Sequence, residues 1–204
     1  MGMSRAILDF PFSRLGYNGR GGHVRMATID QQSGDIGSLV TLLEGAGARP
    51  NSEALAKVAK TLAGLFAVDP DEVAILKTVP RFKSLKFVIP EKLSPVGTIP
   101  LTSTNALAAR TARERRPELL NNFNSSRHLV VFEAVRLGRD PNETIHKIMS
   151  APIFDGKQVQ GVVQISRKGR TSADAGPDFT QKELHALAAL SPILERFLKL
   201  LPTD

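Results

Sequence analysis

The sequence predicts an α+β fold with a central antiparallel sheet and helices on its faces. Apolar residues recur at three- and four-residue steps within 55–66 and 184–201, the spacing of a helix that buries one side. Between these segments, two short apolar runs at 73–79 and 84–89 each end at a proline, as strands do. Strands that are preceded and followed by helices favour an antiparallel sheet covered by those helices.

The chain divides into two parts of different character. Residues 1–50 are rich in glycine and other helix breakers, and only 36–43 is apolar enough for a short helix or strand. We expect this part to be an irregular or partly disordered N-terminal segment. Residues 51–204 carry the periodic patterns and are predicted to form the folded domain, which suits a chain of 204 residues.

The predicted elements of the folded domain follow in order. The first helix is capped by Asn51 or Ser52 and stopped at Asp69-Pro70. After the two strands, a loop at 90–100 leads to a helix at about 103–116. A polar stretch at 121–126 and a short helix at 128–135 complete the middle of the domain.

A hairpin and a capped helix end the domain. Asp155-Gly156 separates the strands 145–154 and 159–165, and such a pair between β-rich runs is a strong hairpin signal. Thr180 and Glu183 form a capping box at the start of the last helix. Pro192 is predicted to kink that helix.

Composition excludes several kinds of chemistry. The chain has no cysteine, so disulfides, thiolate catalysis and cysteine–zinc sites are absent. Its four histidines are widely spaced, so we expect no metal site, and neither His128 nor His146 has a supporting feature that would make it a ligand. No phosphate-binding loop or catalytic constellation is visible, and the protein is expected not to be an enzyme. The sequence identifies no cofactor.

The charge and the hydropathy restrict the location and the partners. The net charge of +7 suits an anionic ligand, a phosphorylated partner or simply a soluble surface. Four arginines of the middle helix spread around it without interleaved aromatic residues, so nucleic acid is not expected as a partner: Arg110, Arg113, Arg115 and Arg116. No apolar run is long enough to span a membrane, and residues 1–15 do not form a signal peptide. We therefore expect a cytoplasmic protein without a membrane partner.

The ordered set of motifs resembles the GAF domain family. The hairpin 148–165 is similar to the family's central hairpin, which reads apolar residues, a proline, a short turn, and then a glycine between apolar residues. Upstream, Gly97-Thr98-Ile99-Pro100-Leu101, the alanine-rich stretch 107–112 and Arg116-Pro117 are similar to another stretch of the family. The resemblance covers roughly 52–200. It implies that the terminal helices cover one face of the sheet and that the variable middle encloses a ligand pocket on the other face.

Some members of the family bind cyclic nucleotides through a signature of Asn-Lys, Phe and Asp-Glu. The matching places here read Ser166-Arg167, Phe179 and Glu183-Leu184, and these departures argue against cyclic-nucleotide binding. Members that attach bilins and members that reduce free methionine sulfoxide work through cysteine, which this chain lacks.

The resemblance places a candidate small-molecule site over the sheet. Amides of the polar stretch could orient a ligand, and apolar residues would line its pocket. The same amides could instead bond to their own backbone in turns. The candidate ligand-binding residues are Ile99, Leu101, Asn121, Asn122, Phe123, Phe132, Glu133 and Met149.

The last helix carries a second apolar stripe that predicts a homodimer. Its residues, spaced 3-4-3, form the candidate dimer interface: Leu190, Ile193, Phe197 and Leu200. A second stripe on a terminal helix favours packing against another helix, as in a dimer. The alternative cover is the N-terminal segment, with Phe10, Phe12 and the stretch 39–43.

Two functions remain open. The first is a non-catalytic sensory and regulatory domain of signal transduction, which binds an unidentified small molecule and dimerises. The second is a ligand-free dimerisation or interaction module whose pocket is filled by its own side chains. No output module is visible after Leu201, so the signal is expected to pass to a separate effector protein.

Overall fold

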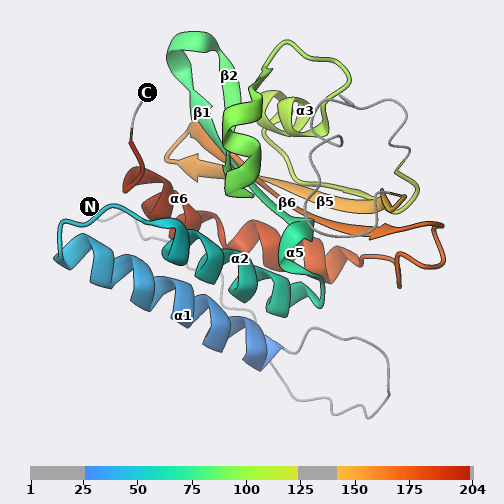
Figure 1. The fold of residues 1–204 in the computed structure, drawn as a ribbon, viewed down its shortest axis with the longest axis horizontal. Coiled ribbons are helices and arrows are strands. Elements are labelled where there is room, and N and C mark those ends of the chain that lie inside the picture. The colour runs from blue at the N-terminus through green and yellow to red at the C-terminus, as the bar shows by residue number, and fades with distance from the viewer. Residues whose placement is uncertain (1–25, 124–141, 203–204) are drawn as a thin grey trace, which may run out of the picture.

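The computed structural model describes residues 26–123 and 142–202 and contains a six-stranded antiparallel sheet in the order β3-β2-β1-β6-β5-β4 (Figure 1). The strands are β1 (Val73–Val79), β2 (Ser84–Ile89), β3 (Thr98–Pro100), β4 (Glu118–Leu120), β5 (Thr144–Asp155) and β6 (Gln158–Gly169). The helices are α1 (Met26–Gly45), α2 (Ser52–Phe66), α3 (Leu107–Glu114), α5 (Gln181–Ala189) and α6 (Ser191–Lys199). Short 3-10 turns are η1 (Pro70–Glu72), η2 (Pro80–Phe82) and η3 (Glu91–Val96). The predicted α+β class with a central antiparallel sheet is confirmed.

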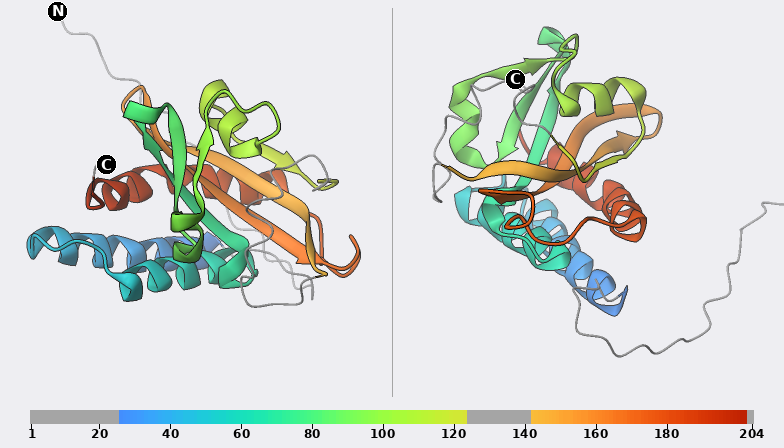
Figure 2. Two further views of the ribbon diagram at one scale, coloured as in Figure 1. Left: turned by 45° about the horizontal axis from the view of Figure 1, so that its top comes forward. Right: turned by 90° about the vertical axis from the view of Figure 1, so that its right-hand side faces the viewer.

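The elements form layers on both sides of the sheet. Helices α2, α5 and α6 cover one face, the helix face, and α3 covers the other, the α3 face (Figures 1 and 2). Helix α1 lies outside α2 and α6 as an additional layer and packs on both. No helix in the described part of the chain is long and apolar enough to cross a membrane.

Strand alternation divides the core between the two faces. In β1, Ile75 faces the core under the terminal helices, whereas Leu76 faces the core under α3. In β6, Val163 and Val162 divide in the same way. Since successive side chains of a strand point to opposite sides, continuous apolar runs such as 73–76 indicate a sheet that is buried on both faces.

Local signals at the helix ends agree with the sequence. The Asn51 side chain accepts a hydrogen bond from the Ala54 amide at 2.9 Å and so caps α2. At α5, the Thr180 hydroxyl accepts from the Glu183 amide at 3.2 Å, and the Glu183 carboxylate accepts from the Thr180 amide at 2.7 Å. This is the predicted capping box, which satisfies two amides that would otherwise lack partners.

The structure corrects the prediction for residues 1–50, because residues 26–45 form helix α1. Its described side chains include Ile36 and Val40, which are 1% and 0% exposed and belong to the core of the helix face. Three glycines lower the intrinsic helix propensity of this segment, and packing against α2 and α6 outweighs that cost. Residues 1–25, with Phe10 and Phe12, lie outside the described residues.

The predicted last helix is two helices, since α5 ends at Ala189 and α6 begins at Ser191 with Pro192 in its first turn. The second apolar stripe belongs to α6 and the residues that flank it, and it is covered within the chain. Leu190 and Phe197 are 3% and 0% exposed, and Ile193 and Leu200 are half-buried against the same core. The assignment of these residues to a dimer interface is corrected, because the alternative cover, the N-terminal segment, lies over them as α1.

One glycine of α1 permits this close packing. A Cβ at Gly37 would lie 3.0 Å from Cδ1 of Ile193, which is tighter than most contacts of real Cβ atoms. The absent side chain therefore lets α6 approach the backbone of α1.

Candidate ligand-binding face

The α3 face is mostly apolar where α3 crosses the sheet. Helix α3 packs on β2, β5 and β6. Leu107 at its start joins Phe123 and Ile148 in one small cluster. Next to that cluster, α3 and strands β1, β2, β3 and β6 build a larger one that includes Leu76, Leu85 and Ile99.

Three polar side chains are set into this apolar face. The Thr111 hydroxyl of α3 and the Ser150 hydroxyl of β5 share a hydrogen bond of 2.7 Å, and both residues are 0% exposed. The Gln164 amide of β6 donates to the Ser150 hydroxyl at 3.1 Å. Gln164 itself is half-buried, and its amide oxygen accepts no hydrogen bond from the described residues. We call Thr111, Ser150 and Gln164 the polar trio.

The register of the sheet explains why the trio assembles. Ser150 and Gln164 are direct partners in the β5–β6 ladder, and residues directly opposite each other on antiparallel strands have close side chains. Thr111 lies in the middle of α3 on its buried side. A buried hydroxyl without a hydrogen-bond partner lowers the stability of the folded state. The hydrogen bonds within the trio avoid this cost in the apolar face.

Ion pairs and carbonyl contacts anchor the arginines of the α3 segment. Arg110 contacts Glu118 of β4 through two bonds, from Nε at 3.0 Å and from a terminal nitrogen at 2.7 Å. Arg113 donates to backbone carbonyls of the loop before α3, and Arg115 donates to the Lys157 carbonyl. Arg116 pairs with Glu114 at 2.5 Å. The first three arginines fasten α3 to its surroundings, Arg116 pairs with the end of α3 itself, and the four do not form a single basic stripe, as the sequence indicated.

The polar stretch that follows β4 has divided roles. Asn121 exchanges two hydrogen bonds of 2.9 Å with the backbone of Phe179, so its amide is committed to the protein itself. Asn122 is exposed and Phe123 is buried. The amide of Asn121 thus bonds to a distant segment of the chain, which is neither a ligand contact nor the bond to its own turn that the alternative predicted.

The other predicted ligand residues fall in three places. Ile99 is buried in the α3-face core, and Leu101 is half-buried against it. Met149 lies on the helix face among the core residues under the terminal helices, so its assignment to the ligand site is corrected. Phe132 and Glu133 lie outside the described residues, as does the helix predicted at 128–135.

Sequence reasoning missed all three members of the polar trio. The alternation of side chains along the strands was the available signal. Met149, Val163 and Ile165 face the core under the terminal helices, so their neighbours Ser150 and Gln164 face the other side of the sheet. A polar residue at every second place of a doubly buried strand indicates a polar spot on one face.

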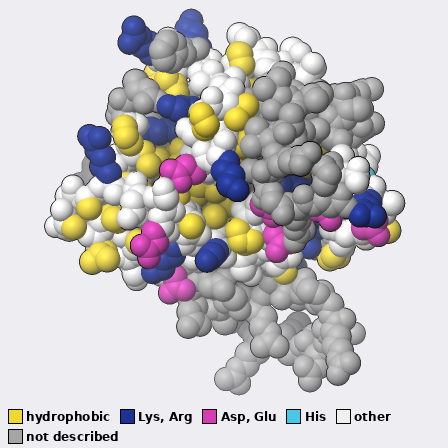
Figure 3. Space-filling model, viewed as in Figure 1, with side chains coloured by type: hydrophobic (Ala, Val, Ile, Leu, Met, Phe, Trp, Pro, Cys, Tyr) yellow, Lys and Arg dark blue, Asp and Glu magenta, His cyan; other side chains and the backbone are white. Residues whose placement is uncertain are grey.

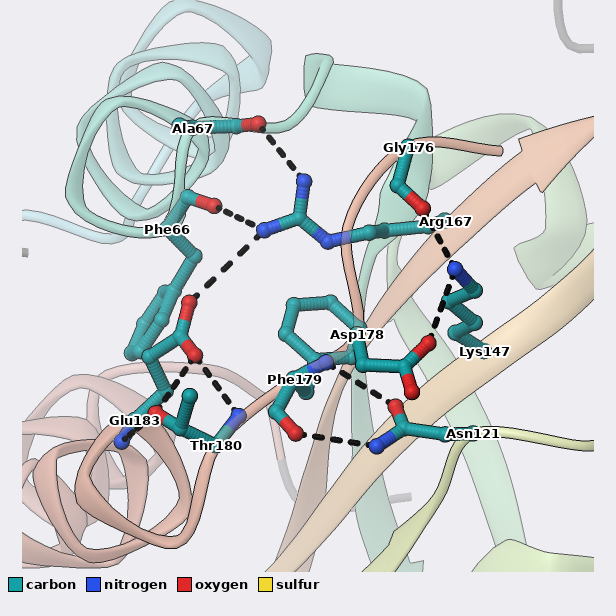
Figure 4. A network of polar contacts seen from close by, with 10 residues as sticks. All are labelled: Phe66, Ala67, Asn121, Lys147, Arg167, Gly176, Asp178, Phe179, Thr180 and Glu183. Atoms are coloured by element: carbon teal, nitrogen blue, oxygen red, sulfur yellow. Dashed lines mark hydrogen bonds and ion pairs between the residues drawn. The ribbon is translucent and has the colours of Figure 1, made fainter. Parts of the chain in front are cut away.

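Three residues of the cyclic-nucleotide signature, Arg167, Phe179 and Glu183, gather on the helix face instead (Figure 4). Arg167 is 8% exposed, and the carbon of its guanidinium lies 4.4 Å from the centroid of the Phe179 ring. One terminal nitrogen lies 3.7 Å from a Glu183 oxygen and donates to the Phe66 carbonyl at 3.2 Å. Burial lowers the pKa of Arg167, and the charge of Glu183 opposes that shift.

A second buried cation lies beside Arg167. Lys147 of β5 is the direct cross-strand partner of Arg167 and is 5% exposed. Its ammonium contacts the Gly176 carbonyl and lies 2.9 Å from an Asp178 oxygen. These contacts join β5 and β6 to the start of α5 and the end of α2. The signature positions thus fasten the helix layer and do not line the α3 face.

Within residues 26–123 and 142–202, no three or more His, Cys, Asp or Glu side chains gather in a way that could hold a metal ion. His146 lies with Nε2 3.1 Å from the Gly169 carbonyl, and His128 lies outside the described residues.

The comparisons with known proteins agree with this architecture. The sequence pattern of the GAF domain matches residues 50–196, and no curated protein matches the chain. The GAF domain of an Acinetobacter phosphoenolpyruvate-protein phosphotransferase superposes with a TM-score of 0.55 at 15% identity, covering 86% of this chain and 95% of that one. Residues 122 to 287 of a methyl-accepting chemotaxis protein give 0.53 at 16% identity, covering 81% and 96%.

An enzyme is also among these neighbours. Free methionine-R-sulfoxide reductase from Neisseria meningitidis, in complex with its substrate, superposes with a TM-score of 0.57 at 16% identity, covering 85% of this chain and 90% of that one. The expectation that the chain is not an enzyme is contradicted by this neighbour, because the same fold carries catalysis. At this identity the likeness shows the fold and no activity.

Proposed function

The chain belongs to the GAF domain family, and from that premise we propose that it is a sensory and regulatory module of signal transduction that binds a small molecule on the α3 face. The polar trio is the observation that supports this proposal. Thr111, Ser150 and Gln164 place hydrogen-bonding groups in a face that is otherwise lined by apolar side chains. Apolar walls with a few converging polar groups are typical of small-molecule sites.

The trio also suggests the chemistry of the ligand. Gln164 offers an amide oxygen, while the Thr111 and Ser150 hydroxyls are already bonded to each other. Glu118 of β4 is the cross-strand partner of Ser150, but its carboxylate is already paired with Arg110 of α3. The ligand expected here is therefore a small, largely apolar molecule with a hydrogen-bond donor that meets Gln164.

The ligand-free interaction module is the second candidate. The burial of Ile99, Leu107 and Phe123 favours it, because each of these side chains already packs within the chain's own clusters. The module would then act through its surface and not through a bound molecule.

The homodimer, the separate effector and the cytoplasmic location remain parts of the proposal. Because the four residues first assigned to the dimer interface lie in the chain's own core, a dimer would use another surface. The outward side of α1, where Leu42 is 70% exposed, is available for it.

Native mass spectrometry of the purified full chain tests the proposal. We expect a bound small-molecule mass that disappears on denaturation, and the mass of the complex gives the number of chains directly. A bare chain would favour the ligand-free module.

Variants locate the bound molecule. Gln164→Ala is expected to lower the bound fraction, whereas Gln158→Ala, an exposed position on the same strand, is expected to leave it unchanged. An equal bound fraction in both variants would place the ligand away from the polar trio.

A further inference from the structure

Five exposed cations gather at one end of the sheet. They come from the turn between β1 and β2, from the C-terminal end of α3 and from the turn between β5 and β6. Figure 3 shows Lys and Arg side chains at the first of these turns. We call the five residues the basic end: Arg81, Lys83, Arg113, Arg115 and Lys157.

Backbone contacts join the three segments of the basic end. The Leu101 amide donates to the Lys83 carbonyl at 2.9 Å, and Arg113 donates to the Leu101 carbonyl at 2.5 Å. Two residues further along, Arg115 donates to the Lys157 carbonyl. The five charges therefore lie on one continuous surface.

Little negative charge within these segments offsets the basic end. The backbone carbonyls that accept hydrogen bonds from its arginines of α3 are neutral, so the positive charge of each guanidinium remains. The two carboxylates of the same segments are paired with other cations, Glu114 with Arg116 and Asp155 with Lys199. The basic end therefore has a positive potential that attracts acidic groups.

Two of the five cations occupy backbone conformations that favour glycine. Lys83 has a φ of 45° and Arg115 a φ of 57°, in the left-handed region, which is unfavourable for residues with a side chain. Among the described residues, Ala67 is the other non-glycine residue with a positive φ. Stability alone would favour glycine at both positions, and residues held in unfavourable backbone conformations are concentrated at functional sites.

We infer that the basic end is a docking surface for an acidic segment of a partner protein. The carboxylates of that segment pair with Lys83, Arg113 and Arg115. The two guanidinium groups are fixed by their carbonyl contacts, and their planar arrangement of N–H donors suits carboxylates.

A nucleic acid fits this surface less well. The Phe154 ring is half-buried and lies under the guanidinium of Arg115, 5.9 Å from its carbon to the ring centroid, so this ring does not offer a free face for a base to stack on. The surface gives the separate effector of the proposed function a place to bind, and the inference rests on the proposed function to that extent.

Fluorescence anisotropy of a labelled octa-glutamate peptide, titrated with the full chain, tests this inference. We expect saturable binding that weakens as the salt concentration rises, and no binding of octa-glutamine. Lys83→Gly should weaken binding about threefold, which is the size expected for the loss of one exposed ion pair, and Lys83→Gly/Arg115→Gly should weaken it about tenfold. Lys83→Gly should at the same time raise the midpoint of urea denaturation, because glycine adopts the left-handed conformation freely. A variant that is more stable and binds less separates docking from folding.

Lys60→Gln is the matched control, because it removes one positive charge from an exposed position of α2. An equal loss of affinity in this variant would overturn the inference, since it would indicate only the overall charge of the chain. Unchanged affinity in Lys83→Gly would overturn it as well, and so would tighter binding of a labelled eight-nucleotide thymidine strand than of octa-glutamate at the same salt concentration. The small molecule expected in native mass spectrometry does not involve the basic end, so the ligand and the docking surface can fail separately.

Discussion

At the scale of single residues, the buried pair of cations on β5 and β6 shows how the fold tolerates charge. Lys147 and Arg167 lie directly opposite each other, in an arrangement that is unfavourable by itself. Arg167 lies beside the carbonyls of Phe66 and Ala67, at the negative end of the α2 dipole, and beside Glu183. Carbonyls and carboxylates thus surround the two charges, and the charged network fastens β5 and β6 to α2 and α5.

Arg167→Gln should lower the free energy of unfolding by about 3 kcal/mol, because it leaves the buried Glu183 without its ion partner. Urea denaturation measures the loss. The double variant Arg167→Gln/Glu183→Gln should lose less than the sum of the two single variants, since no uncompensated charge remains. Strict additivity would contradict the coupling of the pair. Lys182→Gln, an exposed change in the same helix, should alter stability by no more than about 0.5 kcal/mol.

Glu72 gives stability a dependence on pH of defined sign. Burial raises the pKa of its carboxyl group, and the hydrogen bond from the Lys168 amide at 2.6 Å opposes this shift. The folded pKa lies above the ordinary value of 4.5, so the folded state binds the proton more tightly than the unfolded state. The stabilising contribution is therefore complete below that value and is lost as the pH rises through the folded pKa.

Comparison of the wild-type protein with Glu72→Gln isolates this contribution. The unfolding free energy of the wild type, measured relative to the variant, should fall as the pH is raised from below 4.5 to neutrality. A constant difference across that range, apart from the offset caused by hydrogen bonds that glutamine cannot make, would show that the pKa is not raised.

At the scale of elements, Gly161 fixes how closely β6, β1 and α6 can pack. A Cβ there would lie 2.3 Å from the Leu76 carbonyl oxygen and 2.7 Å from Cδ1 of Leu198. The first of these atoms belongs to the backbone of the neighbouring strand and cannot rotate away. Only glycine at this position therefore allows β6 to pack this closely against both β1 and α6.

Gly161→Ala should destabilise the protein by about 3 kcal/mol through overpacking between β6, β1 and α6. Thermal or urea denaturation gives the value. Gly34→Ala in α1 is the control, because a Cβ there meets open space, and it should stabilise the helix by about 0.5–1 kcal/mol. A neutral Gly161→Ala variant would show that the strands can separate without cost.

The elements also show what the sequence could predict. The runs 73–79 and 84–89 are strands β1 and β2 with the predicted bounds, because each run ends at a β-branched residue that is followed by proline. Strands β3 and β4 are three residues each, too short for periodicity to reveal, and their pairing with β2 and β5 comes from tertiary packing. Of helix α1, only 36–43 was predicted, as a short helix or strand, because its glycines conceal a pattern that its contacts with α2 and α6 complete.

The candidate site was predicted less well than the fold. The family resemblance directed attention to the polar stretch after β4, but Asn121 bonds to Phe179 and Met149 has the opposite strand parity. The polar trio depends on α3 being laid across β5 and β6, a contact between segments about 40 residues apart. No local pattern specifies such a contact.

At the scale of the whole molecule, α1 completes the core of the helix face. Val40→Asp should place a charge against that core and detach α1, which would expose the apolar stripe of α6. We expect increased binding of a fluorescent hydrophobic dye and self-association in light scattering, since exposed apolar patches promote both.

Ser38→Asp is the control, because Ser38 is exposed on the same helix. It should leave dye binding and mass unchanged. If Val40→Asp behaved in the same way, the stripe would be covered without α1.

The position of α1 determines how easily another helix could bind to the apolar stripe of α6. A short connection, residues 46–51, joins α1 to α2, so the stripe on α6 meets its helix as an intramolecular partner at an effective concentration on the order of millimolar. A helix from another protein with a similar apolar stripe would have to compete against that local concentration. Helix α1 thus competes with any other helix for the stripe. Another helix, including α1 of a second copy, would displace it only by binding the stripe more tightly than α1 does at this local concentration.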